Sequence, residues 1–235
     1  MSNFASSPSV ILKNVRLDYF DAWTPGAPMD EKDKDDLKKW KFKAKVILDP
    51  KSEAAEVARK AFSDAAQALW GVNYNNVVAA MSKNNKAIRN GNEVLTQDGA
   101  VKAMYVDSLM VSCSNSARPV VVGPRKFNGK FVDIDASGRA FQNGVELNPP
   151  PYQTIAPYRG CYVNLKVQFV AGKTQGKLPN QVYAKFEALQ FVKDGEAFDN
   201  AACSAVGFDG GVVSPRTGRV TLVVCVKPLE SVAVN

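Results

Sequence analysis

Alternation of lysine with apolar residues near the N-terminal quarter of the chain is the feature that most restricts the fold. The segment reads KWKFKAKVIL, so that lysine occupies every second position from Lys39 to Lys45 and core-like residues fill the positions between. A period of two is typical of a β-strand, because successive side chains of a strand point to opposite faces. We therefore expect a strand over residues 39–48 with one basic face and one buried face.

One clear helix follows that strand. Asp49 and Pro50 end the strand. They also suit the start of a helix, because Asp is a good N-cap and Pro is tolerated at the first helical position. In SEAAEVARKAFSDAAQALWG, apolar residues recur at intervals of three and four from Ala54 to Leu69, and Gly71 stands where a C-terminal cap belongs. The spacing predicts a helix over this segment.

The other patterned segments indicate strands. Besides residues 9–20, strand-length runs separated by Gly, Pro, Asn and Asp lie at 100–114, 118–124, 129–135, 158–172, 180–195 and 218–228. Many strands with one helix after an early strand favour a mainly β fold of the α+β class, a barrel or sandwich with one helix across it, and argue against βαβ alternation. We expect a single domain, 1–235, with a surface loop at 21–38 and an Asn-rich insertion at 72–98 that contains a helical turn at NNVVAAM.

Composition excludes several function classes. The chain has 235 residues, 46% hydrophobic and 23% charged, which is typical of a soluble globular protein, and no apolar run approaches the roughly 20 residues of a membrane span. It contains no histidine, which excludes Ser-His-Asp and Cys-His catalysis and nearly all common zinc sites. Its four cysteines are too far apart for a CxxC motif. Cys113, Cys161 and Cys225 lie among alternating or apolar residues, where we expect buried free thiols, whereas Cys203 is less clearly placed. We expect an intracellular protein with no cofactor and no membrane partner.

Two motifs imitate ligand sites. The segment AGKTQGK at 171–177 contains the GKT of a phosphate-binding loop but has Val167 where that loop needs glycine, so a hairpin loop is favoured. The segment DIDASG at 133–138 imitates a calcium loop, yet Gly144 stands where the bidentate glutamate belongs, so a turn is favoured. We therefore predict no catalytic and no metal-binding residues, with a nuclease that uses Asp133 and Asp135 as a lower-ranked alternative.

Basic and aromatic side chains share the polar faces of later strands as well. The net charge of +7 favours a polyanionic partner. In YVNLKVQFV, Tyr162 and Lys166 lie opposite the apolar row, whereas the core face of VYAKFEALQFV is ambiguous. A solvated outer face is the simpler explanation for one such strand. Lysines that follow phosphates, interleaved with tyrosines that stack on bases, are what single-stranded nucleic acid requires.

A family resemblance adds to this pattern. The strand KFKAKVILDP running into KSEAAEVARKAFSDAAQALWG, and later APYRGCYVNLKVQFV followed by VYAKFEALQFVKDGEAF, resemble single-stranded DNA-binding proteins of tailed phages, including the podovirus type. The match covers roughly residues 38–70 and 150–198. The resemblance implies an OB-fold, a five-stranded antiparallel barrel with a helix and extended loops. It also implies a protein of DNA replication, recombination or repair in the cytoplasm of the infected host, with phage replication proteins as further partners. Homodimer formation stays open.

The leading hypothesis is a non-enzymatic protein that binds single-stranded DNA without sequence specificity. The alternative is a β-rich phage structural or assembly protein. The expected DNA contacts are basic side chains for phosphates and aromatic side chains for bases: Lys41, Lys43, Lys45, Arg125, Lys126, Arg159, Lys166 and Lys185, with Trp23, Tyr158, Tyr162 and Tyr183.

Overall fold

The structure is a computed structural model in which residues 2–28, 33–95, 99–147, 155–174 and 179–198 are described. Residues up to Phe198 form one compact unit. The expected strand at 218–228 lies outside the described residues, as do Cys203, Cys225 and the tip of the loop at 175–178. Among the described helices, none is both long enough and apolar enough to cross a membrane.

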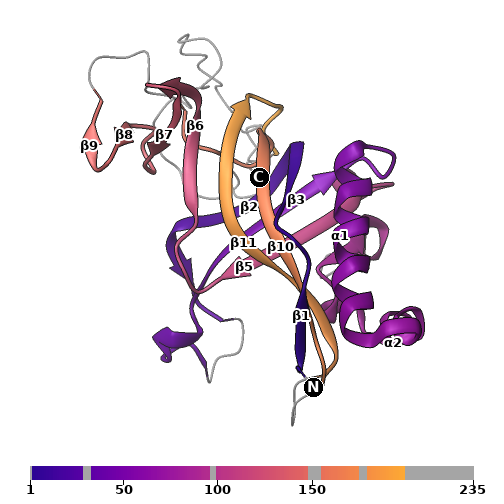
Figure 1. The fold of residues 1–235 in the computed structure, drawn as a ribbon. Helices are drawn as coiled ribbons and strands as arrows, with labels where there is room; N and C mark the ends of the chain where they lie inside the picture. Colours follow the sequence, from indigo (N-terminus) through magenta and orange to yellow (C-terminus); the bar gives the residue numbers. More distant parts are fainter. Residues whose placement is uncertain (1, 29–32, 96–98, 148–154, 175–178, 199–235) are drawn as a thin grey trace, which may run out of the picture. The chain divides into compact units, whose positions relative to one another are not determined.

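Five strands close into a barrel (Figure 1). They pair in the order β10-β2-β3-β5-β11, and β10 also pairs with β11, which completes the ring. The pairs are antiparallel except β5 with β11, which is parallel. The strands are β2 (Val10–Gly26), β3 (Lys41–Leu48), β5 (Leu109–Asn115), β10 (Tyr162–Gly172) and β11 (Gln181–Lys193). The predicted OB-type barrel is thereby confirmed.

Smaller strands add to this sheet. β1 (Phe4–Ser6) pairs with β10, and β4 (Ile88–Asn90) pairs with β5. Beyond β11 the sheet continues through four strands, which lie together away from α1 in Figure 1: β6 (Val120–Phe127), β7 (Lys130–Ile134), β8 (Ala140–Gln142) and β9 (Val145–Glu146). Short 3-10 helices lie between these elements, at Leu37–Lys39, Gly71–Asn73, Lys83–Asn85, Gly91–Glu93 and Ala103–Tyr105.

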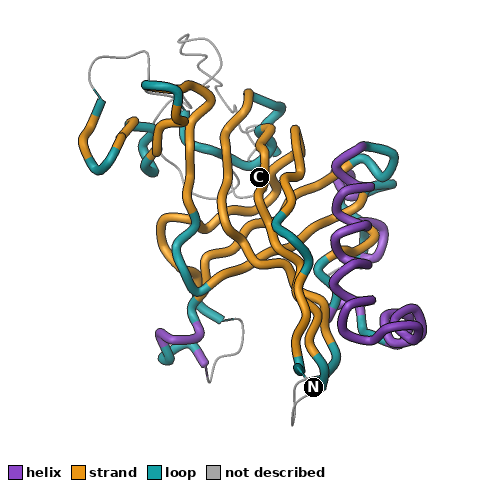
Figure 2. The backbone as a smooth tube through the Cα atoms, in the orientation of Figure 1, coloured by secondary structure: helices purple, strands orange, loops and turns teal. Residues whose placement is uncertain are grey.

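Within the described residues the α-helices are α1 (Glu53–Trp70) and α2 (Tyr74–Ala80), and both lie on one side of the barrel (Figure 2). α1 contacts β2, β10 and β1 with a face of small residues that are fully buried, such as Ala55 and Ala58. Its Phe62 ring meets the ring of Phe169 edge-on, with the centroids 6.2 Å apart. The alanine stripe lets the helix approach the barrel closely and exclude water from its interior.

The helix starts later than its sequence suggested. Ser52 is the N-cap, and its hydroxyl accepts a hydrogen bond from the Ala55 amide at 3.2 Å. Asp49, the expected cap, instead accepts from the Lys51 amide at 2.8 Å and turns the chain between strand and helix. The helical turn expected at NNVVAAM is present as α2.

The basic strand begins at Lys41 and not at Lys39. Lys39 belongs to a 3-10 helix, and its ammonium lies 2.5 Å from the Asp33 carboxylate. From Lys41 to Val46 the expected alternation holds, since Phe42, Ala44 and Val46 are buried whereas the lysines between them are not. Ile47, on the lysine face, is buried as well. The preceding surface loop is shorter than predicted, because β2 continues to Gly26 instead of ending near residue 20.

One other expectation needs correction, and one ambiguity of the sequence is resolved. Residues 100–108 are not a strand, because Tyr105 turns inward from a 3-10 helix to pack with Ile47 and Met110, and β5 starts at Leu109. β11 contains a register shift where it passes Lys166 and Val167 of β10. Its inward positions therefore change phase after Phe186 and resume at Leu189, which explains why the core face was ambiguous in the sequence.

Candidate nucleic-acid interface

A row of polar side chains crosses three strands on the outer face of the barrel. Lys43 of β3 and Lys185 of β11 are both register partners of Ser114 of β5. Their chain neighbours Ala44 and Ala184 are buried, so the row itself points away from the core. The barrel thus brings together two predicted lysines that are far apart in the chain.

A groove of about 300 Å³ runs beside this row. Its walls come from β3, β5, β11 and residues 84–89, and include Lys43, Ser114 and Tyr183. The segment 84–89 is held in place because the Ala87 amide donates to the Val182 carbonyl at 2.7 Å and the Ala87 carbonyl accepts from the Ser112 amide at 2.9 Å. The Asn-rich insertion therefore forms one wall of the groove.

That wall supplies basic groups that sequence analysis missed. Arg89 lines the groove and donates from its guanidinium to the Ser112 hydroxyl at 3.2 Å, and Lys86 lies three residues before it. Neither residue belongs to a periodic segment, so only their charge could have indicated a role. They raise the positive charge around Lys43 in a place that the alternating strands alone did not identify.

The lysines near the groove differ in whether their ammonium groups already have partners within the protein. Lys41 is exposed, and its side chain has no hydrogen-bond or ion-pair partner within the described part of the chain; the same is true of the Lys185 side chain. The Lys43 ammonium donates to the Ala27 carbonyl at 2.9 Å, and the Lys45 ammonium lies 3.6 Å from the Asp18 carboxylate. Lys41 and Lys185 are therefore the most available cations, while Lys43 and Lys45 are positioned by neighbours.

Tyr183 is the aromatic residue of the groove. Its side chain projects from β11 on the same face as Lys185, and it stays 37% exposed. Partial burial raises the pKa of its hydroxyl, so the ring is a neutral phenol at physiological pH. An exposed neutral ring beside cations can stack on a base.

Two predicted DNA contacts have structural partners instead of an open surface. Arg159 donates to the Asp18 carbonyl at 2.7 Å and its guanidinium lies 3.1 Å from the buried Asp18 carboxylate. The Tyr158 hydroxyl donates to Asp194 and accepts from the Gly195 amide, at 3.0 and 3.2 Å. Both residues fasten the segment before β10 to neighbouring elements.

Other predicted contacts lie away from the groove. Tyr162 and Lys166 belong to β10, which pairs with neither β3 nor β5. The Tyr162 ring has Lys193 at 4.7 Å and Arg16 at 5.1 Å from its centroid, and Lys166 lies 3.3 Å from Glu187. These two residues therefore mark a second basic surface around β10.

The pair Arg125 and Lys126 lies at the end of β6, next to the turn into β7. Both are exposed, and the Lys126 ammonium stands 4.9 Å from the centre of the Phe131 ring. Strand β6 joins the barrel through β11. This basic turn belongs to the extension formed by β6–β9 and not to the groove.

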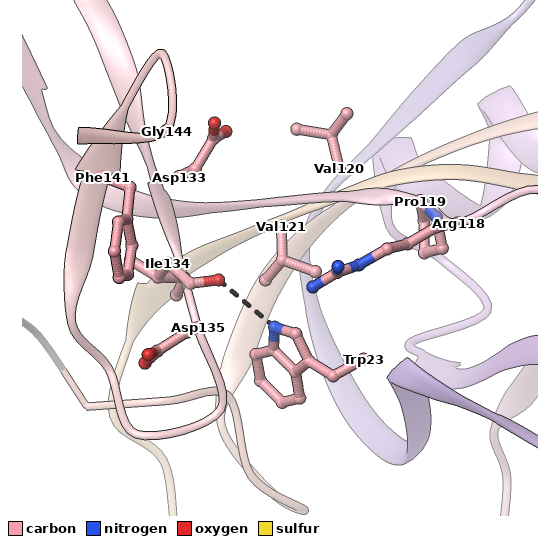
Figure 3. A pocket seen from close by; sticks show the side chains of 10 residues that line it. All are labelled: Trp23, Arg118, Pro119, Val120, Val121, Asp133, Ile134, Asp135, Phe141 and Gly144. Carbon is pink, nitrogen blue, oxygen red and sulfur yellow. Dashed lines mark hydrogen bonds between the residues drawn. The ribbon is translucent and has the colours of Figure 1, made fainter. Parts of the chain in front are cut away.

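Trp23 lines a separate pocket between β2 and that extension (Figure 3). Its indole N–H donates to the Ile134 carbonyl at 3.2 Å, and its ring meets Phe20 edge-on at 4.8 Å. The opposite wall includes Val121 and Phe141, with Arg118 beside the indole.

The described residues contain no group of three or more side chains suited to hold a metal. Asp135, the candidate in the calcium-like motif, accepts hydrogen bonds from Ser137 and from Arg139, at 2.8 Å in each case. Burial is the largest single influence on Asp135 and opposes its ionisation, but the hydrogen bonds from Ser137 and Arg139 together outweigh it and lower the pKa of this carboxyl. The turn predicted for this motif is confirmed.

Comparison with known proteins agrees with this architecture. A family model described as "Enterobacter phage Enc34, ssDNA-binding protein" matches residues 8–216. Protein p50 of Acyrthosiphon pisum secondary endosymbiont phage 1 is 31% identical over 124 residues, which span 52% of this chain and 54% of that relative. The fold resembles that of the Enc34 protein in complex with ssDNA, with a TM-score of 0.54 and 16% identity over 81% of this chain and 89% of the other. A structure of the same protein described without ssDNA gives a TM-score of 0.52 and 15% identity over 83% and 86%. This chain therefore belongs to the family of the ssDNA-binding protein of phage Enc34.

Proposed function

We propose that this protein binds single-stranded DNA without sequence specificity, in the groove formed by β3, β5, β11 and residues 84–89. The observation that carries the proposal is the row of Lys43 and Lys185 on either side of Ser114, with Tyr183 exposed beside it. Family membership supports it, since the model that matches the chain describes an ssDNA-binding protein.

The chemistry of the groove explains why sequence would not matter. Lys41, Lys43 and Lys185 act as point charges for phosphates, with Lys45 and Arg89 behind them. Tyr183 offers a ring face, on which any base can stack for about 1–3 kcal/mol. In this proposal DNA leaves the groove over one of two further basic surfaces, around Lys166 and Tyr162 or around Arg125 and Lys126.

The biological role that follows is protection of unwound phage DNA during replication, recombination or repair. We place this role in the cytoplasm of the infected host and propose a single-domain protein that works without catalysis. Phage replication proteins are the protein partners in this proposal. A homodimer is compatible with it.

A fluorescence-anisotropy titration with labelled oligothymidylate at several salt concentrations tests the function. Each phosphate neutralised should contribute a slope of about −0.7 in log affinity against log salt. We expect a slope near −2 to −3 for three to four contacts. Affinity that does not change with salt, or binding to duplex DNA as tight as to single strands, would contradict the proposal. Size-exclusion chromatography without DNA addresses the alternative of an assembly protein, for which a stable high-order oligomer is expected.

A further inference from the structure

We infer that the pocket between Trp23 and Arg118 takes an unpaired nucleobase from DNA that leaves the groove. The inference rests on the proposed function but concerns a different cavity, with a volume of about 440 Å³. Its walls are apolar or aromatic over much of their area, from Trp23, Val120, Val121 and Phe141. The flat apolar faces of a nucleobase fit such walls better than a charged phosphate does.

Trp23 is held as a fixed platform. Its single N–H is occupied by the Ile134 carbonyl, and the T-shaped contact with Phe20 sets the plane of the ring at 85° to that of its neighbour. The indole therefore cannot turn without losing both contacts. A rigid aromatic ring loses little conformational entropy when a base stacks on it.

The polar groups of the pocket suit a base attached to a phosphate chain. Arg118 is exposed, points toward the indole in Figure 3, and has no hydrogen-bond or ion-pair partner among the residues that the structure describes. Its guanidinium can bind a phosphate at the rim or stack with a base. The side chain of Asp133 also lacks such a partner within the described ranges. Its carboxylate repels phosphate from the interior and can accept a hydrogen bond from the amino group of a base.

The pocket continues the path of the groove. Ser114 lines the groove, and Arg118 is only four residues further along the chain, so their Cα atoms are at most about 14 Å apart. On the other side, Trp23 lies two residues beyond Asp21, the register partner of Lys43. A DNA strand that passes Lys43 can therefore reach the pocket within a few nucleotides.

A reporter with a single tryptophan tests the inference. Trp40→Phe and Trp70→Phe leave Trp23 as the only tryptophan of the chain. Addition of an oligocytidylate of about 16 nucleotides, the upper site size of an OB fold, should quench its emission. In the same protein Arg118→Ala should weaken the quench and reduce the salt slope by about 0.7.

Binding measurements complete the test. Trp23→Leu keeps an apolar side chain against Phe20 but removes the ring face, and we expect affinity to fall about 5- to 150-fold, the loss of one stacked base. Arg59→Ala, an exposed arginine of α1 outside groove and pocket, is the matched control and should leave affinity unchanged. Thermal unfolding of Trp23→Leu shows whether the variant is folded. If Trp23→Leu does not fold, the effect of Arg118→Ala on the fluorescence quench and on the salt slope tests the base site instead.

The outcomes separate this inference from the proposed function. If DNA binds and Lys43→Ala with Lys185→Ala weakens it, but Trp23 emission and the Arg118→Ala affinity do not change, the pocket is not a base site and the groove proposal stands. If the wild-type protein does not bind single-stranded DNA at all, the proposed function fails first.

Discussion

Lys43 and Lys185 lie on either side of Ser114, each as its register partner, although 142 positions separate them in the chain. Neighbouring strands are about 4.8 Å apart, so the Cα atoms of the two lysines are roughly 10 Å apart. Their like charges reinforce one positive surface. A bound phosphate chain relieves their mutual repulsion.

Replacement of both lysines with alanine is expected to weaken binding to oligothymidylate and to reduce the salt slope by about 1.4, the contribution of two phosphates. Anisotropy titrations at several salt concentrations measure both quantities. Lys60→Ala is the control, because that residue is exposed on α1 and pairs with Asp64. An equal loss in the control would mean that net charge, and not the groove, governs affinity.

Tyr183→Leu is expected to weaken DNA binding by about 1–3 kcal/mol, since the ring face available for stacking is removed. Tyr183→Phe should retain most of the affinity, because the hydroxyl is not needed for stacking. The same titrations compare the two variants with the wild type. Equal losses in both would assign the effect to the hydroxyl and contradict a stacking role.

Asp18→Ala should lower the free energy of unfolding, measured in urea, by about 3–5 kcal/mol, the usual cost of removing one partner of a buried ion pair. Asp18 is only 2% exposed and accepts a hydrogen bond from Tyr105 at 2.6 Å, with Arg159 at 3.1 Å. Removing a buried charge leaves its partners without compensation. Asp64→Ala, in an exposed pair on α1, should cost no more than about 1 kcal/mol. Similar losses for the two variants would contradict the importance of this network.

Arg159→Ala distinguishes a structural role from a DNA contact at the same residue. We expect lower stability with a salt slope of DNA binding equal to that of the wild type. A slope reduced by about 0.7 would instead place Arg159 on the DNA. The same titration and urea series measure both effects.

Cys113 and Cys161 should resist thiol reagents in the folded protein. Cys113 donates to the Ala44 carbonyl inside the barrel, and burial raises its pKa far above the ordinary value. Burial, aided by Asp194, raises the pKa of Cys161 to about 11. At about pH 8 both therefore remain thiols, which are poor nucleophiles.

A Cys203→Ser, Cys225→Ser variant isolates these two thiols for reaction with a disulfide reagent. We expect no reaction under native conditions and reaction of both thiols after denaturation. Fast reaction of the folded variant would show that the barrel opens at these positions.

The alternation of side chains could be predicted because it depends on local geometry. In β3 the buried face of Phe42 and Ala44 follows from the period of two, and the stripe of α1 follows from the helical period. The prediction failed for residues 100–108, and the core face of β11 stayed ambiguous, because long-range contacts prevailed in both places. Tyr105 left the expected strand to reach Asp18, and the register shift in β11 moved Leu189 to the inward face.

The candidate site likewise has one part that local geometry predicts and another that depends on long-range contacts. That Lys41, Lys43 and Lys45 share one face follows from the amino-acid sequence alone, since a strand places alternate residues on the same face whatever surrounds it. Which other groups lie beside that face depends on how distant segments pack together. Strand order brought Lys185 and Tyr183 to it, the insertion added Arg89, and the buried carboxylate of Asp18 drew Arg159 inward. These positions depend on strand pairing and burial between segments that are distant in the chain, and no local sequence pattern encodes them.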